Sequence, residues 1–274
     1  MTTLPLILEP SELALHLNDP NLLIIDLSKP ETYQQGHIPG AINVDPTRLL
    51  AGTPPIANKL PSTEQLSTLF SELGLTSKSQ VVLYDDQMGP WAGRMIWTLD
   101  IVGHHQASFL NGHLKAWVNN GGKLETTANQ PTAVEFSASA DFSLVADLED
   151  IFQNLKTPER VIWDARSKQE FRGEKRINAT KAGHIPGAKH LEWTDTLIST
   201  DDWRLKEPQA LRQLLESKGI LPEKEVITHC QTHRRSGLTY VVAKSLGYPH
   251  IRCYDGSWFE WGNHPDTPVE SSVG

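Results

Sequence analysis

One short segment of the 274-residue chain gathers the residue types of a nucleophilic site. Residues 229–237, with the sequence HCQTHRRSG, place a single cysteine between a strand-like run and a helix-like run. A thiolate in such a turn is stabilised by the free N–H groups at the helix start and by nearby cations, here Arg234 and Arg235. The segment therefore predicts a nucleophilic Cys230 with a lowered pKa, rather than a cysteine packed as a small buried hydrophobe.

The flanking elements explain why this cysteine would be accessible to a ligand. Residues 225–228 (EVIT) have the composition of a buried strand. After the loop, an apolar stripe at helical spacing predicts a helix; it consists of Leu238, Val241, Val242 and Leu246. Turns at the carboxyl ends of strands are the usual ligand sites of open α/β sheets.

The second cysteine, Cys253, lies on a predicted strand with no helix start beside it, so it is expected to be structural. The two cysteines match no zinc-ligand spacing, and no metal site is predicted. A free thiol in a reducing cytoplasm is the simplest interpretation.

Composition excludes several classes of function. A formal net charge of -8 argues against a nucleic-acid-binding surface, and 38% hydrophobic residues are typical of an ordinary globular protein. The N-terminal segment lacks the basic start of a signal peptide, and no apolar run is long enough to span a bilayer. A cytoplasmic protein that binds neither nucleic acid nor membrane is therefore expected.

An internal repeat organises the chain. The sequence Gly-His-Ile-Pro-Gly-Ala occupies residues 36–41 and recurs unchanged at 183–188, and Gly112 stands 144 positions before Gly256. A repeat of this length predicts two domains of like fold. Because glycine permits unusual backbone angles and proline restrains φ, the repeated motif is interpreted as a fixed turn rather than as a catalytic site of its histidines.

Strand-like and helix-like runs alternate within each half, which predicts an α/β fold with a mostly parallel sheet flanked by helices. Small and polar residues dominate 125–141, where neither periodicity persists. The predicted organisation is a first domain at 1–124, a linker at 125–141 and a second domain at 142–274.

The duplicate serves as an internal control for the cysteine loop. Alignment at the offset of 144 places Asp86 opposite Cys230 and Gln87 opposite Gln231, with loops of equal length. The first domain then has no thiol and no arginine cluster, so one active site per chain is predicted, in the second domain.

A second contrast concerns the end of the first strand of each half. Arg166 stands where the first half has Ser28. Its guanidinium is expected to reach an anionic substrate over Cys230. The alternative is a surface ion pair with Glu170 or Asp164.

These features resemble the rhodanese family, in particular tandem-domain sulfurtransferases with an inactive first domain and a catalytic second domain. The marks are the paired Gly-His-Ile-Pro-Gly-Ala motifs, Asp86 in place of a first-domain cysteine, and a loop similar to bacterial loops that read Cys-Gln-Thr-His. The resemblance implies transfer of sulfane sulfur from thiosulfate to cyanide or a thiol acceptor through a persulfide on Cys230. It implies no metal or organic cofactor.

The residues expected to bind substrate around Cys230 are Arg166, Gln231, Thr232, His233, Arg234, Arg235 and Ser236. Arg234 and Arg235 are expected either to supply positive charge to the substrate or to brace the loop by pairing outward. The thiosulfate-specific loop of the family carries a basic residue where this chain has Thr232. Thiosulfate is the expected donor and 3-mercaptopyruvate the second choice. His233 is expected either to add positive charge when protonated or, as a hydrogen-bond partner, to hold the loop.

Two other classes of function remain as alternatives. Phosphatases related to this fold place arginine six residues after the cysteine, where this chain has Ser236. The smaller loop favours sulfur over a phosphoryl group. A sulfur carrier would form the same persulfide and pass the sulfur to an acceptor protein. A monomer is expected, since the two halves can bury a face against each other.

Overall fold

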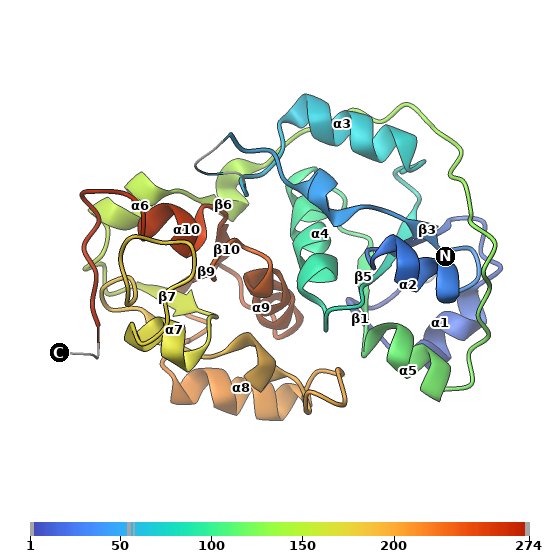
Figure 1. The fold of residues 1–274 in the computed structure, drawn as a ribbon. Helices are drawn as coiled ribbons and strands as arrows, with labels where there is room; N and C mark the ends of the chain where they lie inside the picture. The colour runs from blue at the N-terminus through green and yellow to red at the C-terminus, as the bar shows by residue number, and fades with distance from the viewer. Residues whose placement is uncertain (1–2, 54–55, 57, 272–274) are drawn as a thin grey trace.

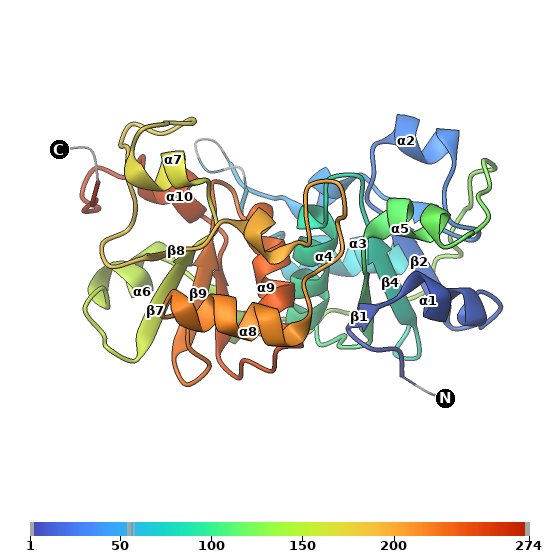
Figure 2. The ribbon, with the colours of Figure 1, turned by 90° about the horizontal axis from the view of Figure 1, so that it is seen from below.

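The computed structural model describes residues 3–53, 56 and 58–271, and it contains two α/β units side by side (Figures 1 and 2). The outer ends of the two predicted domains, at residues 1 and 274, lie outside the described residues. No helix in the described part of the chain is long and apolar enough to cross a membrane.

Each unit is built on a five-stranded sheet in which every pair of neighbouring strands is parallel. The first sheet has the order β1 (Ile7–Leu8), β5 (Ala107–Leu110), β4 (Gln80–Tyr84), β2 (Leu22–Asp26) and β3 (Ile42–Asn43). The second sheet repeats it with β6 (Val145–Ala146), β10 (Ile251–Tyr254), β9 (Glu225–His229), β7 (Arg160–Asp164) and β8 (Lys189–His190). The predicted α/β fold is confirmed.

Helices cover both faces of each sheet. The first unit contains α1 (Pro10–His16), α2 (Pro30–Gln35), α3 (Thr63–Glu72), α4 (Pro90–Ile101) and α5 (His113–Asn119). The second contains α6 (Leu148–Gln153), α7 (Lys168–Arg172), α8 (Pro208–Ser217), α9 (Arg235–Ser245) and α10 (Ser257–Trp261). The described residues also form short 3-10 helices, η1 (Pro46–Leu49), η2 (Phe142–Leu144) and η3 (Trp193–Thr196).

The two units meet through α4 and α9, which lie side by side at the centre of the molecule (Figures 1 and 2). A Cβ atom on Gly93 would lie 2.3 Å from the backbone carbonyl carbon of Gly237, so the helices cross where neither has a side chain. One hydrophobic cluster spans this crossing, with residues of α3 and α4 from the first unit and of α8 and α9 from the second. The hydrophobic core is therefore continuous across the interface between the two units.

The repeated Gly-His-Ile-Pro-Gly-Ala motif forms the same buried turn in both units. The Nδ1 atom of His37 lies 2.8 Å from the carbonyl oxygen of Tyr33, and the two rings stack with centroids 3.6 Å apart. His184 makes the same two contacts with Phe171. These contacts support the interpretation of the motif as a structural turn.

The predicted linker runs along the first unit as irregular chain. Glu125 accepts from the backbone N–H of Gly40 at 2.7 Å and so belongs structurally to the turn of the first unit. Farther on, the Val134 N–H donates to the carbonyl of Ser71 at 3.0 Å. Ala138 donates to the hydroxyl of Ser67 at 3.0 Å, so the segment is fixed along α3.

Candidate active site

Cys230 lies between the end of β9 and the start of α9, as the sequence predicts. Its backbone N–H donates to the Ser257 hydroxyl at 3.4 Å, and its carbonyl accepts from the Trp258 N–H at 2.9 Å. The side chain has no solvent exposure, and it lines a cavity of about 690 Å³. The nucleophile is thus recessed, and substrate must enter the cavity to reach it.

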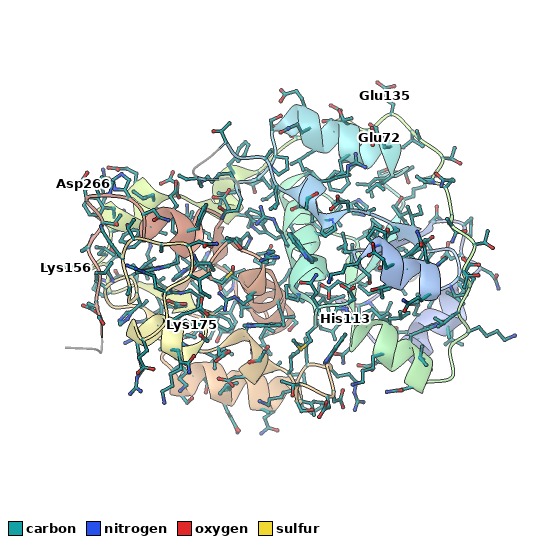
Figure 3. All side chains as sticks on the ribbon, in the orientation of Figure 1. Glu72, His113, Glu135, Lys156, Lys175 and Asp266 are labelled. Carbon is teal, nitrogen blue, oxygen red and sulfur yellow. The ribbon has the colours of Figure 1, made fainter. Side chains whose placement is uncertain are left out.

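The cavity lies between the two units. The first unit contributes Asp86, Gln87, Met88 and Pro90. The second contributes Ser167, Glu170, Lys175, Ile177, Asn178, Trp193, Cys230, Gln231, Thr232, Arg234 and Arg235. Figure 3 shows Lys175 beside α7, on the segment that follows that helix. The lining combines three cationic side chains with an apolar wall.

Burial raises the pKa of the Cys230 thiol, but several groups that favour the thiolate outweigh it and leave the pKa below its usual value. The first is the positive charge of Arg235, followed by hydrogen bonds from the hydroxyl and the N–H of Ser236 and from the N–H of Thr232. This supports the predicted activated nucleophile, because the thiolate is the reactive form of cysteine.

Arg235 is held in place by a buried carboxylate. Its two terminal nitrogens donate to Glu170 at 2.7 and 2.8 Å, and Glu170 also accepts from the Ser167 hydroxyl at 2.8 Å. Although burial disfavours the charged form of Glu170, the pair with Arg235 keeps its pKa below the usual range. The guanidinium therefore has a fixed position beside Cys230 and stays charged.

Arg166 does not reach the cavity, which corrects the expectation that it contacts substrate over Cys230. Its guanidinium turns back to the carboxylate of Asp164 at 2.6 Å and donates to the carbonyl of Gly183 at 2.8 Å. It also lies 4.2 Å from the ring centre of Trp258 and is 1% exposed. The alternative ion pair with Asp164 is the one present, but it is buried, so its role is structural.

Gln231, Thr232 and Arg234 line the cavity, and their contact with substrate stays a prediction. The side-chain amide of Gln231 donates to the carbonyl of Ile177 at 2.6 Å, which ties the segment after α7 to the loop. Arg234 is exposed, and its guanidinium lies 5.2 Å from the ring centre of Trp91 in the first unit.

His233 and Ser236 do not line the cavity; both are fully buried and hold the loop from behind. Burial places the pKa of His233 well below its usual value, so the ring is neutral. Its Nδ1 atom lies 2.7 Å from the Ser236 hydroxyl oxygen. Because that hydroxyl donates to Cys230, it accepts from His233. His233 therefore acts as a hydrogen-bond partner and adds no charge.

The counterpart of Cys230 in the first unit is Asp85 and not Asp86, which corrects the alignment made from sequence. The N–H of Asp85 donates to His113 at 3.2 Å, as the N–H of Cys230 donates to Ser257. The strands agree, since β4 and β9 begin 145 positions apart, at Gln80 and Glu225. The loops between strand and helix are equal in length, as the sequence predicts, at residues 85–89 and 230–234. The extra residue of the first unit lies in α4, which has 12 residues where α9 has 11.

Asp85 fills its own loop with a carboxylate. Its two oxygens accept from the backbone N–H groups of Gln87, Gly89, Trp91 and Ala92 at 2.8, 2.8, 2.9 and 3.0 Å. The side chain is fully buried. This loop geometry thus holds an anion through backbone amides, and in the first unit the protein supplies that anion itself.

Several cavity residues were not predicted from sequence, among them Lys175, Asn178 and Met88. The only local signal was the capping box of Ser167 and Glu170 at the start of α7, which indicated a helix and not a charge partner for Arg235. Among the described residues, no group of three or more His, Cys, Asp or Glu side chains could hold a metal ion.

Comparison with known proteins identifies the family of both units. The family described as "Rhodanese-like domain" matches residues 9–120 and 147–264. The chain is 47% identical to a thiosulfate sulfurtransferase of Azotobacter vinelandii, over 98% of each chain. It is 33% identical to a sulfur carrier protein of Thermus thermophilus, over 93% of this chain and 92% of that protein.

A 3-mercaptopyruvate sulfurtransferase of Escherichia coli is 30% identical, over 94% of this chain and 95% of that protein. Among solved structures, the fold is similar to an anaerobic ergothioneine biosynthesis enzyme from Chlorobium limicola, with a TM-score of 0.84 and 25% identity. That match covers 94% of this chain and 66% of the solved chain. With both units matched and a relative at 47% identity over nearly its whole length, the chain belongs to the rhodanese family, with two tandem rhodanese-like domains.

Proposed function

We propose that the chain is a thiosulfate sulfurtransferase that carries sulfur as a persulfide on Cys230. The observation that carries this proposal is the convergence of Arg235, Ser236 and the N–H of Thr232 on one buried thiolate at a cavity between the domains. The relative from Azotobacter vinelandii, named for thiosulfate, supports the choice of donor.

The reaction has two steps. The Cys230 thiolate attacks the outer sulfur of thiosulfate, the S–S bond of the donor breaks, and sulfite leaves with the bonding electrons. The resulting terminal sulfur is an anion, which the loop amides and the Ser236 hydroxyl stabilise. Cyanide or a thiolate acceptor then attacks that sulfur and releases Cys230 as a thiolate. Atoms and charge balance in each of the two steps without a metal or an organic cofactor.

The other loop residues take different roles in this proposal. Gln231, Thr232 and Arg234 face the cavity and contact donor or acceptor. Arg235 stabilises the anions of both steps through its fixed charge, whereas His233 keeps the loop in shape.

The test is the intact mass of the protein before and after excess thiosulfate, with Cys230→Ala in parallel and cyanide added last. The proposal expects wild type alone to gain one sulfur atom, which cyanide removes as thiocyanate. A gain of equal size on Cys230→Ala would contradict it.

3-Mercaptopyruvate is the second candidate donor, because the cavity is large for thiosulfate and Thr232 supplies no basic side chain. The relative from Escherichia coli supports testing it. Sulfur loading of Cys230 by 3-mercaptopyruvate and not by thiosulfate would make 3-mercaptopyruvate the donor in place of thiosulfate.

The sulfur-carrier alternative differs only in the acceptor, and the relative from Thermus thermophilus supports testing it. A sulfur carrier would form the persulfide, turn over slowly with small acceptors and transfer sulfur fast within a complex with its acceptor protein.

Turnover of a chromogenic phosphate ester that depends on Cys230 would instead favour a phosphatase. We further propose that the chain is a monomer and is cytoplasmic, with the domain interface already buried by α4 and α9.

A further inference from the structure

The Cys230 loop is also contacted from behind by a cation of the first domain. Arg94 lies on α4, and its side chain is completely buried. One terminal nitrogen donates to the carbonyl of His233 at 3.0 Å and approaches that of Thr232 at 3.5 Å. The other donates to the carbonyls of Leu49 and Asn58 at 3.1 and 2.9 Å.

The hydrogen-bond partners of this fully buried guanidinium are backbone carbonyls, while the nearby charges of Asp255 and Cys230 favour its protonated form. Burial is the main effect on Arg94 and lowers its pKa to about 10, so it remains a cation near neutral pH. Taking such a charge out of water is costly unless the site uses its hydrogen bonds.

The chemistry of the loop explains what those hydrogen bonds accomplish. For the N–H groups of a loop to converge on an anion, the carbonyls that lie between them in the chain must point away from it. Those carbonyls are buried at the domain interface and need donors. Arg94 donates to the carbonyls of Thr232 and His233, which lie in the loop between the Thr232 and Ser236 N–H groups that hydrogen-bond to Cys230.

His233 also adopts an unfavourable backbone conformation, with φ at 52°. A side chain other than glycine in this region needs support from its surroundings. Besides the bond from Arg94, the ring of Trp97 meets the His233 ring edge-on, with centroids 4.5 Å apart. One face of α4 therefore holds both the backbone and the side chain of His233.

We propose that Arg94 is a positioning residue for sulfur transfer, which holds the Thr232 and His233 carbonyls so that the loop amides face Cys230. The first domain, which lacks a thiol of its own, thereby completes the anion-binding loop of the second. This inference rests on the proposed function for its place in the reaction, but its effect on the thiolate is measurable without any sulfur donor.

The test compares Arg94→Met and Arg94→Lys with wild type by the pH dependence of Cys230 alkylation with iodoacetamide. Because amides that no longer face the sulfur favour the thiolate less, we expect the profile of Arg94→Met to move to higher pH. The rate constant at pH 6 should fall by about tenfold, less than the ~100-fold typical of a lost donor that touches the anion itself. Arg94→Lys keeps the cation but presents its donors from one atom, so its profile should lie nearer to Met than to wild type.

The matched control is Asp100→Asn, on the same helix and the same interface. Asp100 accepts from the Tyr240 hydroxyl at 2.8 Å and from Lys244 at 2.6 Å, and it does not contact the loop. Asp100→Asn should lower the melting temperature and leave the alkylation profile unchanged. Cys253, whose pKa burial raises well above its usual value, does not contribute at pH 6.

Two outcomes would overturn the proposal. Profiles of the folded Arg94 variants that coincide with wild type would overturn it, as would a wild-type profile for Arg94→Lys, which would reduce the effect to charge alone. If Arg94→Met does not fold, Arg94→Lys carries the comparison. Failure of wild type to take up sulfur from any donor would refute the proposed function and leave the Arg94 result standing.

Discussion

Replacement of Asp85 by alanine measures how strongly a loop of this geometry holds an anion. In the first domain the carboxylate of Asp85 is buried and accepts four backbone N–H groups, from Gln87, Gly89, Trp91 and Ala92. Alanine removes all four bonds and leaves these amides without an acceptor. The backbone can then relax or admit water, but it keeps the strand and helix on either side.

The expected cost follows from these contacts. A hydrogen bond to a charged group contributes ~1.5–3 kcal/mol, whereas loss of an ordinary helix cap costs ~0.5–2 kcal/mol. The four bonds share one carboxylate, so they do not add in full, and two of the donors lie at the start of α4, where water can replace the acceptor. We expect Asp85→Ala to lower the free energy of unfolding by about 4 kcal/mol.

Asp86→Ala is the matched control, because it removes the same charge one residue away. Asp86 is half-buried and accepts from the Thr32 hydroxyl at 2.9 Å and from the N–H of Lys29 at 3.3 Å. Its replacement should cost about 1 kcal/mol. The assay is urea unfolding of both variants and wild type. A loss for Asp85→Ala no greater than that for Asp86→Ala would refute the reasoning and the structural match of Asp85 with Cys230.

Three further predictions concern the active loop and the interface. Arg235→Met removes the main charge that lowers the pKa of Cys230, so sulfur loading at pH 7 should slow by tenfold or more, as measured by rapid-quench mass spectrometry. Burial lowers the pKa of His229 to about 4, whereas the unfolded ring titrates near ~6.5. As pH falls from 6.5 to 4, the unfolded state takes up this proton before the folded state does. The free energy of unfolding should therefore drop by up to ~3 kcal/mol. Urea titrations at pH 7 and 4.5 should show a smaller drop for His229→Asn than for wild type. Gly93→Ala places a Cβ atom 2.3 Å from the Gly237 backbone, and calorimetry should show a destabilisation of about 1–3 kcal/mol; an unchanged melting temperature would contradict the close crossing.

The parts of the fold that sequence predicts well are those encoded locally. Apolar runs that end at Asp26 and Asp164 form the interior strands β2 and β7, and the stripe after Cys230 forms α9. The anion-binding turn follows from the same local order of strand, cysteine and helix. These features need no knowledge of what lies across the molecule.

The errors arose where a long-range contact decides the outcome. The offset of 144 holds for the strands β5 and β10, which begin at Ala107 and Ile251, but not for β4 and β9. The extra residue of the first unit falls in the first turn of α4, between Pro90 and Gly93, so it leaves no trace in the motifs on either side. Likewise, the Arg166 guanidinium pairs with the nearby carboxylate of Asp164 and so is not available to a substrate. The positions of the two residues in the sequence do not decide between these partners.

The first domain contributes to the active site although it has no thiol in its own loop. Its loop 86–90 forms one wall of the cavity, and α4 supplies both Arg94 and the close crossing with α9. The Asp85 carboxylate is a permanent part of the chain, and it holds the start of α4 through the N–H groups of Trp91 and Ala92. In the second domain the corresponding anion is the thiolate, which must change charge and bonding during each turnover. The Asp85 loop of the first domain holds the start of α4, and α4 in turn supports the Cys230 loop of the second domain. The two copies of the loop thus have different roles, one structural and one catalytic.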